Sequence, residues 1–134
     1  FANNATLAGH VEVGDWAILG GLAAVHQWSR IGCHSFIGGL AAVTRDLLPF
    51  GMAVGNRANL EGINLVGMRR RNFSKSEIDE VKKVYSILFN ANDLEFKNKI
   101  NKLKEEKFSS DPAKIITDFV NVETSRAYVS PTEI

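Results

Sequence analysis

The sequence predicts a parallel β-helix followed by a C-terminal helical domain. Two observations indicate this fold class: a six-residue hydrophobic period in the first part of the chain, and helical patterning with capping signals in the second. Composition changes in step, since eight of the eleven glycines lie at or before Gly51 and the segment 68–107 carries 11 basic and 7 acidic residues. We expect β-helix coils over 1–48, a connecting loop over 49–60 and helices over 61–134.

The six-residue period defines the first element. Large apolar residues occupy every sixth position: Phe1, Leu7, Val13, Leu19, Val25, Ile31, Ile37 and Val43. Alanine or serine dominates a column four residues later, and glycine is common directly after the large residue, where we expect backbone angles that other residues resist. Three hexapeptides make a triangular coil of about 18 residues, and coils stack at about 4.8 Å. A glycine-rich β-sandwich with coincidental spacing is the alternative.

The second part of the chain predicts four helices. A short helix is expected over 60–70, and Ser74 with Glu77 forms a capping box for the next. Asn92 or Asp93 is expected to cap a third helix, and the Asp111-Pro112 pair to begin a fourth. Their apolar stripes are Ile78, Val81, Val84, Tyr85 and Leu88, then Phe96, Ile100 and Leu103, then Ile115, Ile116, Phe119 and Val120.

Composition excludes several classes of protein. The single cysteine, Cys33, excludes a disulfide framework and a thiolate metal cluster. A net charge of +1 gives no global field for nucleic acid or a membrane surface, and no apolar run is long enough to span a membrane. Nucleotide-binding loops and hydrolase motifs are absent from the sequence. Asp15 and Asp46 fall at turn positions, where we expect them to be solvated.

Histidines and arginines supply the candidate chemistry. The spacing of His10, His26 and His34 places His10 and His26 slightly less than one coil apart, so these two are expected on neighbouring coils, within side-chain reach. A histidine pair suits proton transfer or the binding of phosphate or sugar hydroxyls, whereas a lone corner histidine would bond a backbone carbonyl. The consecutive Arg69, Arg70 and Arg71 suit either a helix C-terminus or an anion site.

Several motifs together resemble one family. They are NNATLAGHV (3–11), AVHQ (24–27), IGG (37–39), GN (55–56) and the run GINLVGMRR (62–70). This set is similar to the UDP-N-acetylglucosamine O-acyltransferases, over essentially the whole chain. The resemblance implies a left-handed, hexapeptide-repeat parallel β-helix. It also implies transfer of a 3-hydroxyacyl chain from acyl carrier protein to the 3-hydroxyl of UDP-N-acetylglucosamine, the first step of lipid A biosynthesis.

The resemblance also implies roles for particular residues. The backbone N–H of Gly9 matches the family's oxyanion donor, and His10 and His26 match histidines that line the sugar and acyl site, with Gln27 beside them. The family's general-base histidine lies just before the segment 3–11, and this chain lacks it. We therefore expect a C-terminal fragment that is inactive by itself.

Further roles concern the substrates. Asn64 and Arg70 match residues that hold the uridine nucleotide, and Gly39 matches the position that limits acyl-chain length. Val66 replaces an acidic residue that many relatives carry near the nucleotide. The resemblance further implies a cytoplasmic homotrimer with sites between subunits, no metal or other cofactor, and an acidic carrier protein docked on the basic segment 68–107.

Three alternatives remain open from the sequence. An N-acyltransferase of the same pathway also joins a β-helix to C-terminal helices. A zinc hydratase of the γ-carbonic-anhydrase type would need three histidines at one metal ion, but the spacing of His10, His26 and His34 differs from the close pairs that it uses. A non-catalytic trimeric scaffold is the third alternative.

Overall fold

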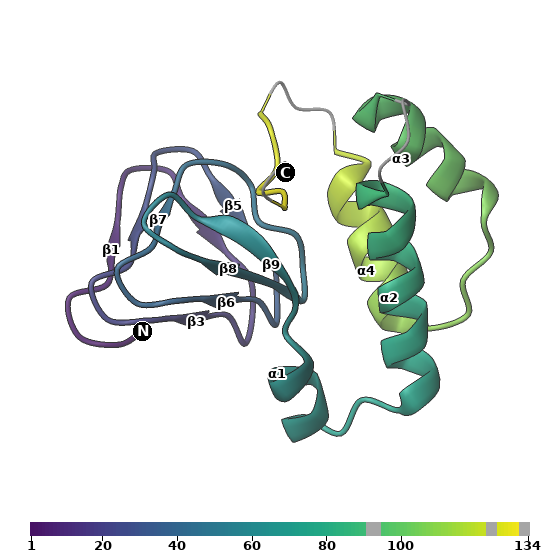
Figure 1. Ribbon diagram of the computed structural model, residues 1–134, viewed down its shortest axis with the longest axis horizontal. Coiled ribbons are helices and arrows are strands. Elements are labelled where there is room, and N and C mark those ends of the chain that lie inside the picture. Colours follow the sequence, from purple (N-terminus) through teal and green to yellow (C-terminus); the bar gives the residue numbers. More distant parts are fainter. Residues whose placement is uncertain (91–94, 123–125, 132–134) are drawn as a thin grey trace.

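The chain begins as a stack of triangular coils (Figure 1). The structure, a computed structural model, describes residues 1–90, 95–122 and 126–131. On each side of the coil a strand pairs in parallel with the third strand after it, as in Thr6 with Ala24 and Glu12 with Arg30, which confirms the predicted coil length. The coil strands are β1 (Thr6–Leu7), β2 (Glu12–Val13), β3 (Ile18–Leu19), β4 (Ala24–Val25), β5 (Arg30–Ile31), β6 (Phe36–Ile37) and β7 (Ala42–Val43).

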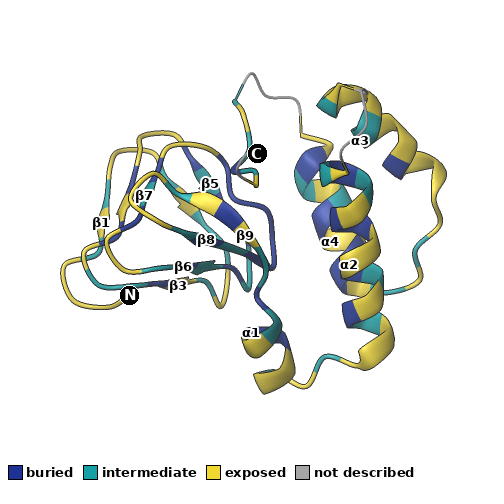
Figure 2. Cartoon of the chain, viewed as in Figure 1, coloured by how far each residue is buried: buried dark blue, intermediate teal, exposed yellow. Residues whose placement is uncertain are grey.

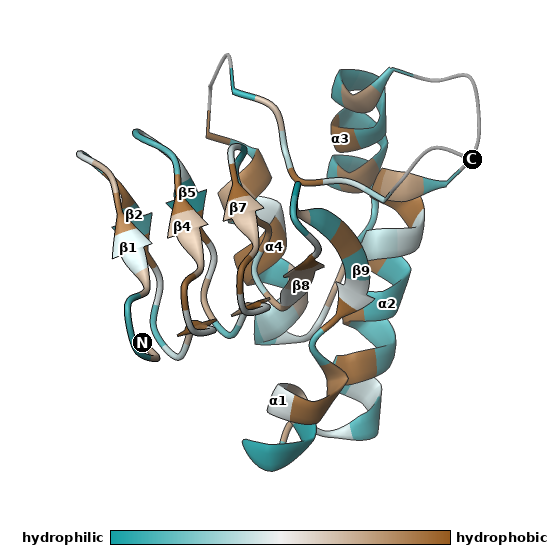
Figure 3. Cartoon of the chain, turned by 60° about the vertical axis from the view of Figure 1, so that its left-hand side comes forward, coloured by the Kyte–Doolittle hydropathy of each residue, from teal (hydrophilic) through white to brown (hydrophobic). Residues whose placement is uncertain are grey.

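The strands form three walls. Wall 1 contains β1, β4 and β7, and wall 2 contains β2 and β5. Wall 3 contains β3, β6 and β8 (Gly51–Val54), with β9 (Asn59–Ile63) antiparallel at its edge. Figure 3 shows the coils as separate layers, with the helices at one end of the stack.

Three corners join these walls. The histidine corner (His10, Trp28) joins walls 1 and 2, the aromatic corner (Trp16, His34, Phe50) joins walls 2 and 3, and the leucine corner (Asn4, Leu22, Leu40) joins walls 3 and 1.

From Leu7 to Val43 the six-residue column fills the interior, as predicted, whereas Phe1 at its start is 69% exposed. Leu19 and Ile37 are fully buried, and Val25, Ile31 and Val43 are nearly so (Figure 2). Leu7 and Val13, on the first coil, are half-buried and pack against the same core. The small-residue column is also internal, because Ala23, Ser29, Ser35 and Ala41 are buried.

Glycine in the third column serves a purpose that differs from our expectation. The backbone angles are ordinary there, and the left-handed positions are instead the corners, where seven residues from Asn4 to Leu40 have φ between 55° and 70°. A Cβ on Gly14 would lie 2.5 Å from the nitrogen of Cys33, and one on Gly20 equally close to that of Gly39. Glycine is therefore required by the close approach of successive coils.

Separate segments cover the last coil on each wall. Strand β9 covers wall 3, Arg57 pairs with Ala42 on wall 1, and Tyr128 pairs with Asp46 beside wall 2. The segment 49–60, expected as a loop, thus contains β8 and the start of β9. The expected helix over 60–70 is wrong in its first part, because residues 59–63 continue the sheet.

The described residues that follow contain four helices: α1 (Leu65–Arg70), α2 (Lys75–Phe89), α3 (Phe96–Glu105) and α4 (Asp111–Val120). The capping box of Ser74 and Glu77 is present, and all five predicted apolar residues of α2 are buried. Ser110 caps α4 instead of Asp111, and Asn92 and Asp93 lie outside the described residues. Among the described helices, none has the length and apolar character needed to cross a membrane.

The carboxylate of Glu80 joins α2 to the start of α4. It accepts hydrogen bonds from the backbone N–H and hydroxyl groups of Ser109 and Ser110. These bonds, with those from Ser110 the strongest, lower the pKa of Glu80 to about 2. The contact fixes the start of α4 against α2 without fully burying the carboxylate.

The close coil contact predicts a difference between two adjacent glycines. Gly20→Ala should lower the free energy of unfolding by about 1–3 kcal/mol, because its Cβ would overlap the backbone of Gly39. In Gly21→Ala the added Cβ would lie 3.5 Å from the nearest atom, so the change should stay within about 1 kcal/mol. Urea denaturation of both variants measures this, and equal effects would contradict the role assigned to Gly20.

Candidate functional site

Four of the predicted site residues lie together at the histidine corner. Gly9 and His10 form the turn of one coil, and His26 and Gln27 lie in the corresponding turn of the next coil, since the strands before these two turns pair Leu7 with Val25. All four are exposed. Among the described residues the N–H of Gly9 makes no backbone hydrogen bond, and a Cβ added there would meet no atom within 4 Å. The corner thus presents an open N–H donor beside imidazole and amide side chains.

His10 packs against Trp28, a residue for which the sequence predicted no role. Its imidazole stacks on the indole of Trp28, with ring centroids 4.0 Å apart and planes 9° from parallel. The expected partner, His26, falls just short of a full coil after His10, whereas Trp28 lies a full coil later. The coil period of the sequence therefore pairs His10 with Trp28. A hollow of about 430 Å³ adjoins the stacked pair, and its lining includes Arg30, Val122 and Arg126.

Asn64 and Arg70 lie at a different corner of the same chain. Asn64 is buried and caps α1: its oxygen accepts from the N–H of Gly67, and its amide donates to the carbonyl of His34. Arg70 is exposed in the last turn of α1. Arg71 turns back, with its guanidinium 5.0 Å from the ring centroid of Trp16. Within one chain, therefore, these residues flank the aromatic corner and not the histidine corner.

His34 is the middle layer of the aromatic corner, between Trp16 and Phe50, and is half-buried. Its ring stacks on Phe50 with a centroid distance of 5.2 Å, and Phe73 meets it edge-on. Burial, then the positive charge of Arg71, lowers the pKa of His34. His34 is thus a packed residue, and it does not converge with His10. Among the described residues, no group of three or more histidine, cysteine or acidic side chains is placed to hold a metal ion.

Gly39 lies beside the leucine corner and is exposed. A Cβ there would lie 3.2 Å from the carbonyl oxygen of Gly21, one coil earlier, so a side chain needs a small adjustment of its neighbour. Its position is separated from His10 by the width of wall 1. The predicted residues therefore occupy all three corners of one chain.

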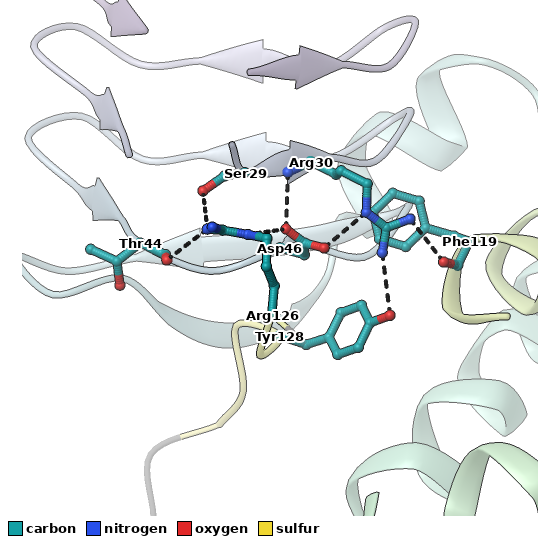
Figure 4. A network of polar contacts seen from close by, with 7 residues as sticks. All are labelled: Ser29, Arg30, Thr44, Asp46, Phe119, Arg126 and Tyr128. Carbon is teal, nitrogen blue, oxygen red and sulfur yellow. Dashed lines mark hydrogen bonds and ion pairs between the residues drawn. The ribbon is translucent and has the colours of Figure 1, made fainter. Parts of the chain in front are cut away.

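Asp46 is fully buried, which corrects the expectation of a solvated turn residue. Figure 4 shows the polar contacts around its carboxylate. Its carboxylate accepts from the Nε atoms of Arg30, at 2.8 Å, and Arg126, at 3.1 Å. Arg30 also donates to the carbonyl of Phe119 at the end of α4 and to the hydroxyl of Tyr128. Arg126 donates to Ser29 and to the carbonyl of Thr44. This network joins wall 2, α4 and the segment 126–130 beside the hollow.

Stacked six-residue repeats that end in a helical domain define the class: a hexapeptide-repeat β-helix protein. The profile of a family described as "Udp N-acetylglucosamine O-acyltransferase; Domain 2" matches residues 46–129. The chain therefore belongs to the UDP-N-acetylglucosamine O-acyltransferase family. The coils are accordingly those of a left-handed parallel β-helix.

Individual relatives agree with this assignment. An acyl-(acyl-carrier-protein)–UDP-N-acetylglucosamine O-acyltransferase of Burkholderia thailandensis is 46% identical over 122 residues, which are 89% of this chain and 47% of the relative. The UDP-N-acetylglucosamine acyltransferase of Francisella novicida superposes with a TM-score of 0.86 at 32% identity, over 96% of this chain and 46% of that one. The UDP-N-acetylglucosamine acyltransferase from Campylobacter jejuni superposes with a TM-score of 0.82 at 36% identity, over 98% of this chain and 50% of that one. The chain spans about half the length of these relatives.

The buried Asp46 predicts a large loss of stability on truncation. Asp46→Ala leaves two guanidinium groups without their shared carboxylate, so the free energy of unfolding should fall by about 3 kcal/mol or more. Asp15→Ala is the matched control, because Asp15 is an exposed turn residue, and it should change stability by less than about 0.5 kcal/mol. Chemical denaturation compares the two, and similar small effects would show that the network is dispensable.

Proposed function

We propose that the full-length protein transfers a 3-hydroxyacyl chain from acyl carrier protein to the 3-hydroxyl of UDP-N-acetylglucosamine, in the cytoplasm, as the first step of lipid A biosynthesis. The family assignment and the names of the relatives support this reaction. The observation that carries it is the histidine corner, where the open N–H of Gly9 lies beside His10.

The proposed chemistry is acyl transfer through a tetrahedral intermediate. The sugar oxygen attacks the thioester carbonyl, whose oxygen becomes negatively charged and accepts a hydrogen bond from the N–H of Gly9. His10, His26 and Gln27 orient the sugar and the thioester. The resemblance assigns removal of the hydroxyl proton to a histidine on the preceding coil, outside these 134 residues. When the carbon–sulfur bond breaks, that proton passes to the departing thiolate.

The nucleotide residues can reach this corner only from another copy. The outward side chains of wall 3 are large and apolar (Ile18, Phe36 and Met52), whereas those of wall 1 are small (Thr6, Ala24 and Ala42). Complementary shapes of this kind suit a heterologous interface in which wall 3 of one copy packs on wall 1 of the next. Three copies close such a ring, with the leucine corner at its axis.

This ring supports a shared active site. Leu22 and Leu40 are 57% and 67% exposed, so packing at the axis would cover apolar surface that one chain leaves in water. The histidine corner lies at the edge of wall 1 opposite the leucine corner, and the aromatic corner lies at the edge of wall 3 opposite the leucine corner. With the leucine corners at the axis, these two corners meet at the outer edge of each interface. His10 of one copy would then face Arg70 of its neighbour. The groove between the walls leads inward, toward Gly39.

The helical domain is the proposed docking surface for the acyl donor. Exposed lysines on α2 and α3 include Lys82, Lys97, Lys102 and Lys104. Acyl carrier proteins are acidic, so a basic surface favours their encounter and orientation. The end of α4 joins wall 2 through Arg30, which places this domain next to the histidine corner.

A shared site predicts complementation between subunits. In the full-length protein, His10→Ala should lower kcat by about 100-fold, as for loss of a positioning contact. Arg70→Ala should weaken UDP-sugar affinity by roughly 10- to 150-fold, as for loss of a charge-assisted contact. Trimers assembled from equal amounts of both variants should recover about a quarter of wild-type activity, because a quarter of randomly formed interfaces pair two intact corners.

The matched control mixes His10→Ala with Gln27→Ala. Both residues lie at the same corner, so no interface in these mixed trimers contains an intact histidine corner, and activity should not recover. Both mixtures are assayed with acyl carrier thioester and UDP-N-acetylglucosamine. If the His10 and Arg70 variants fail to complement, the site does not lie between subunits. An inactive wild-type protein would refute the proposed reaction.

Acyl-chain length provides a separate prediction. Gly39→Met should shift preference toward shorter acyl chains, because its side chain would project into the groove near the leucine corner, and Gly39→Ala should shift it less. Competition among carrier thioesters of different length measures the profile. Identical profiles for the three proteins would show that Gly39 does not line the acyl groove.

A further inference from the structure

We propose that Trp28 is a positioning residue that holds the imidazole of His10 in one orientation at the acyl-transfer corner. The inference rests on the proposed function only for the role of His10. The stacking itself is a property of the fold.

Trp28 holds both the backbone and the side chain of His10. Its N–H donates to the carbonyl of Gly9 at 3.1 Å, which fixes the peptide bond that joins Gly9 to His10. Its indole lies over the imidazole at 4.0 Å with nearly parallel planes. Both contacts follow from the coil period, because the two residues occupy the same corner on successive layers. Stacking uses the face of the imidazole and leaves its edge, with both nitrogen atoms, available for hydrogen bonds.

Core packing does not account for a tryptophan at this position. In the single chain Trp28 is 55% exposed, so the interior of the β-helix does not cover it. Leu22 and Leu40 occupy equivalent left-handed positions at the leucine corner, with φ of 60° and 63° against 70° for Trp28. The backbone of such a corner therefore accepts leucine. What the indole adds is a flat surface for the ring below it.

An exposed histidine would otherwise sample several side-chain orientations. Catalysis of acyl transfer depends on geometry, and misplacement by about 1 Å can cost roughly 100-fold in rate. The indole limits the imidazole to the plane parallel to its own. Trp28 also lines the hollow beside His10, so the same side chain shapes the surface that an approaching substrate meets.

Trp28→Leu and Trp28→Phe separate this role from a structural one. Leucine keeps an apolar residue that the corner backbone accepts, but it removes the ring. Phenylalanine keeps a ring, and Phe50 shows that phenylalanine is accepted at a left-handed corner, with φ of 64°. In the full-length protein, Trp28→Leu should lower kcat by about 10- to 100-fold with little change in the KM for UDP-N-acetylglucosamine. Trp28→Phe should restore most of the rate.

A spectroscopic readout tests the stacking without an activity assay. The ring current of the indole should shift the carbon-bound proton resonances of His10 upfield, and assignment follows from their loss in His10→Gln. They should move downfield in Trp28→Leu and remain unchanged in Phe108→Leu, since Phe108 packs against Lys83 in the helical domain. Unfolding curves of each variant exclude a global effect.

The outcomes distinguish this proposal from the proposed function. Resonances that do not move in Trp28→Leu would refute the stacking, and resonances that move without a change in kcat would refute positioning. Leucine and phenylalanine variants with equal rates would also overturn it. If the wild-type protein transfers no acyl chain, the reaction is refuted and positioning with it, while the resonances still decide whether Trp28 orders His10.

Discussion

The stacking of successive coils at the spacing of hydrogen-bonded strands is the constraint on which the rest of this structure depends. Strand partners one coil apart leave a layer separation of about 4.8 Å, so side chains can project only inward, outward or at a corner. Inward positions accept a large aliphatic residue followed by a small one. Where two backbones come closest, as at Gly20 and Gly39, a Cβ does not fit. At the corners, side chains on neighbouring layers come into register, and aromatic rings then stack.

This constraint explains how much of the fold could be predicted from the sequence. The column from Leu7 to Val43 and the stripe of α2 were readable because each follows a single period. The period also showed that glycine recurs, but it did not give the reason. Glycine is favoured both where two layers come into close contact and where the backbone is left-handed, so the residue type alone does not distinguish the two causes. Leucine and tryptophan at the left-handed corners, such as Leu22 and Trp28, run against residue preference because the coil imposes the turn. Residues 59–63 carry no residue pattern that separates a strand from a helix. The expected helix therefore began at residue 60, whereas α1 begins at Leu65.

The candidate site was predictable to the extent that it follows the coils. Gly9 and Gln27 were expected at one site, and the register places them at one corner. Trp28 could have been found from the same arithmetic, since it lies one full coil after His10. Arg126 could not, because it joins Asp46 from a distant part of the sequence and no local pattern encodes such a contact. The burial of Asp46 likewise depends on a segment that returns from the far end of the chain.

The Asp46 network gives the helical domain a defined position relative to the proposed chemistry. One carboxylate orients Arg30 and Arg126, and Arg30 in turn holds the end of α4 and the hydroxyl of Tyr128. A carrier protein docked on the helices would therefore be held at a fixed distance from wall 2 and from the histidine corner that ends it. Under the proposed function, the β-helix supplies the surface for the acyl acceptor, and the network connects that surface to the helices on which the donor would dock. Buried ion pairs add little net stability by themselves, so the more consistent role for this one is to fix an orientation.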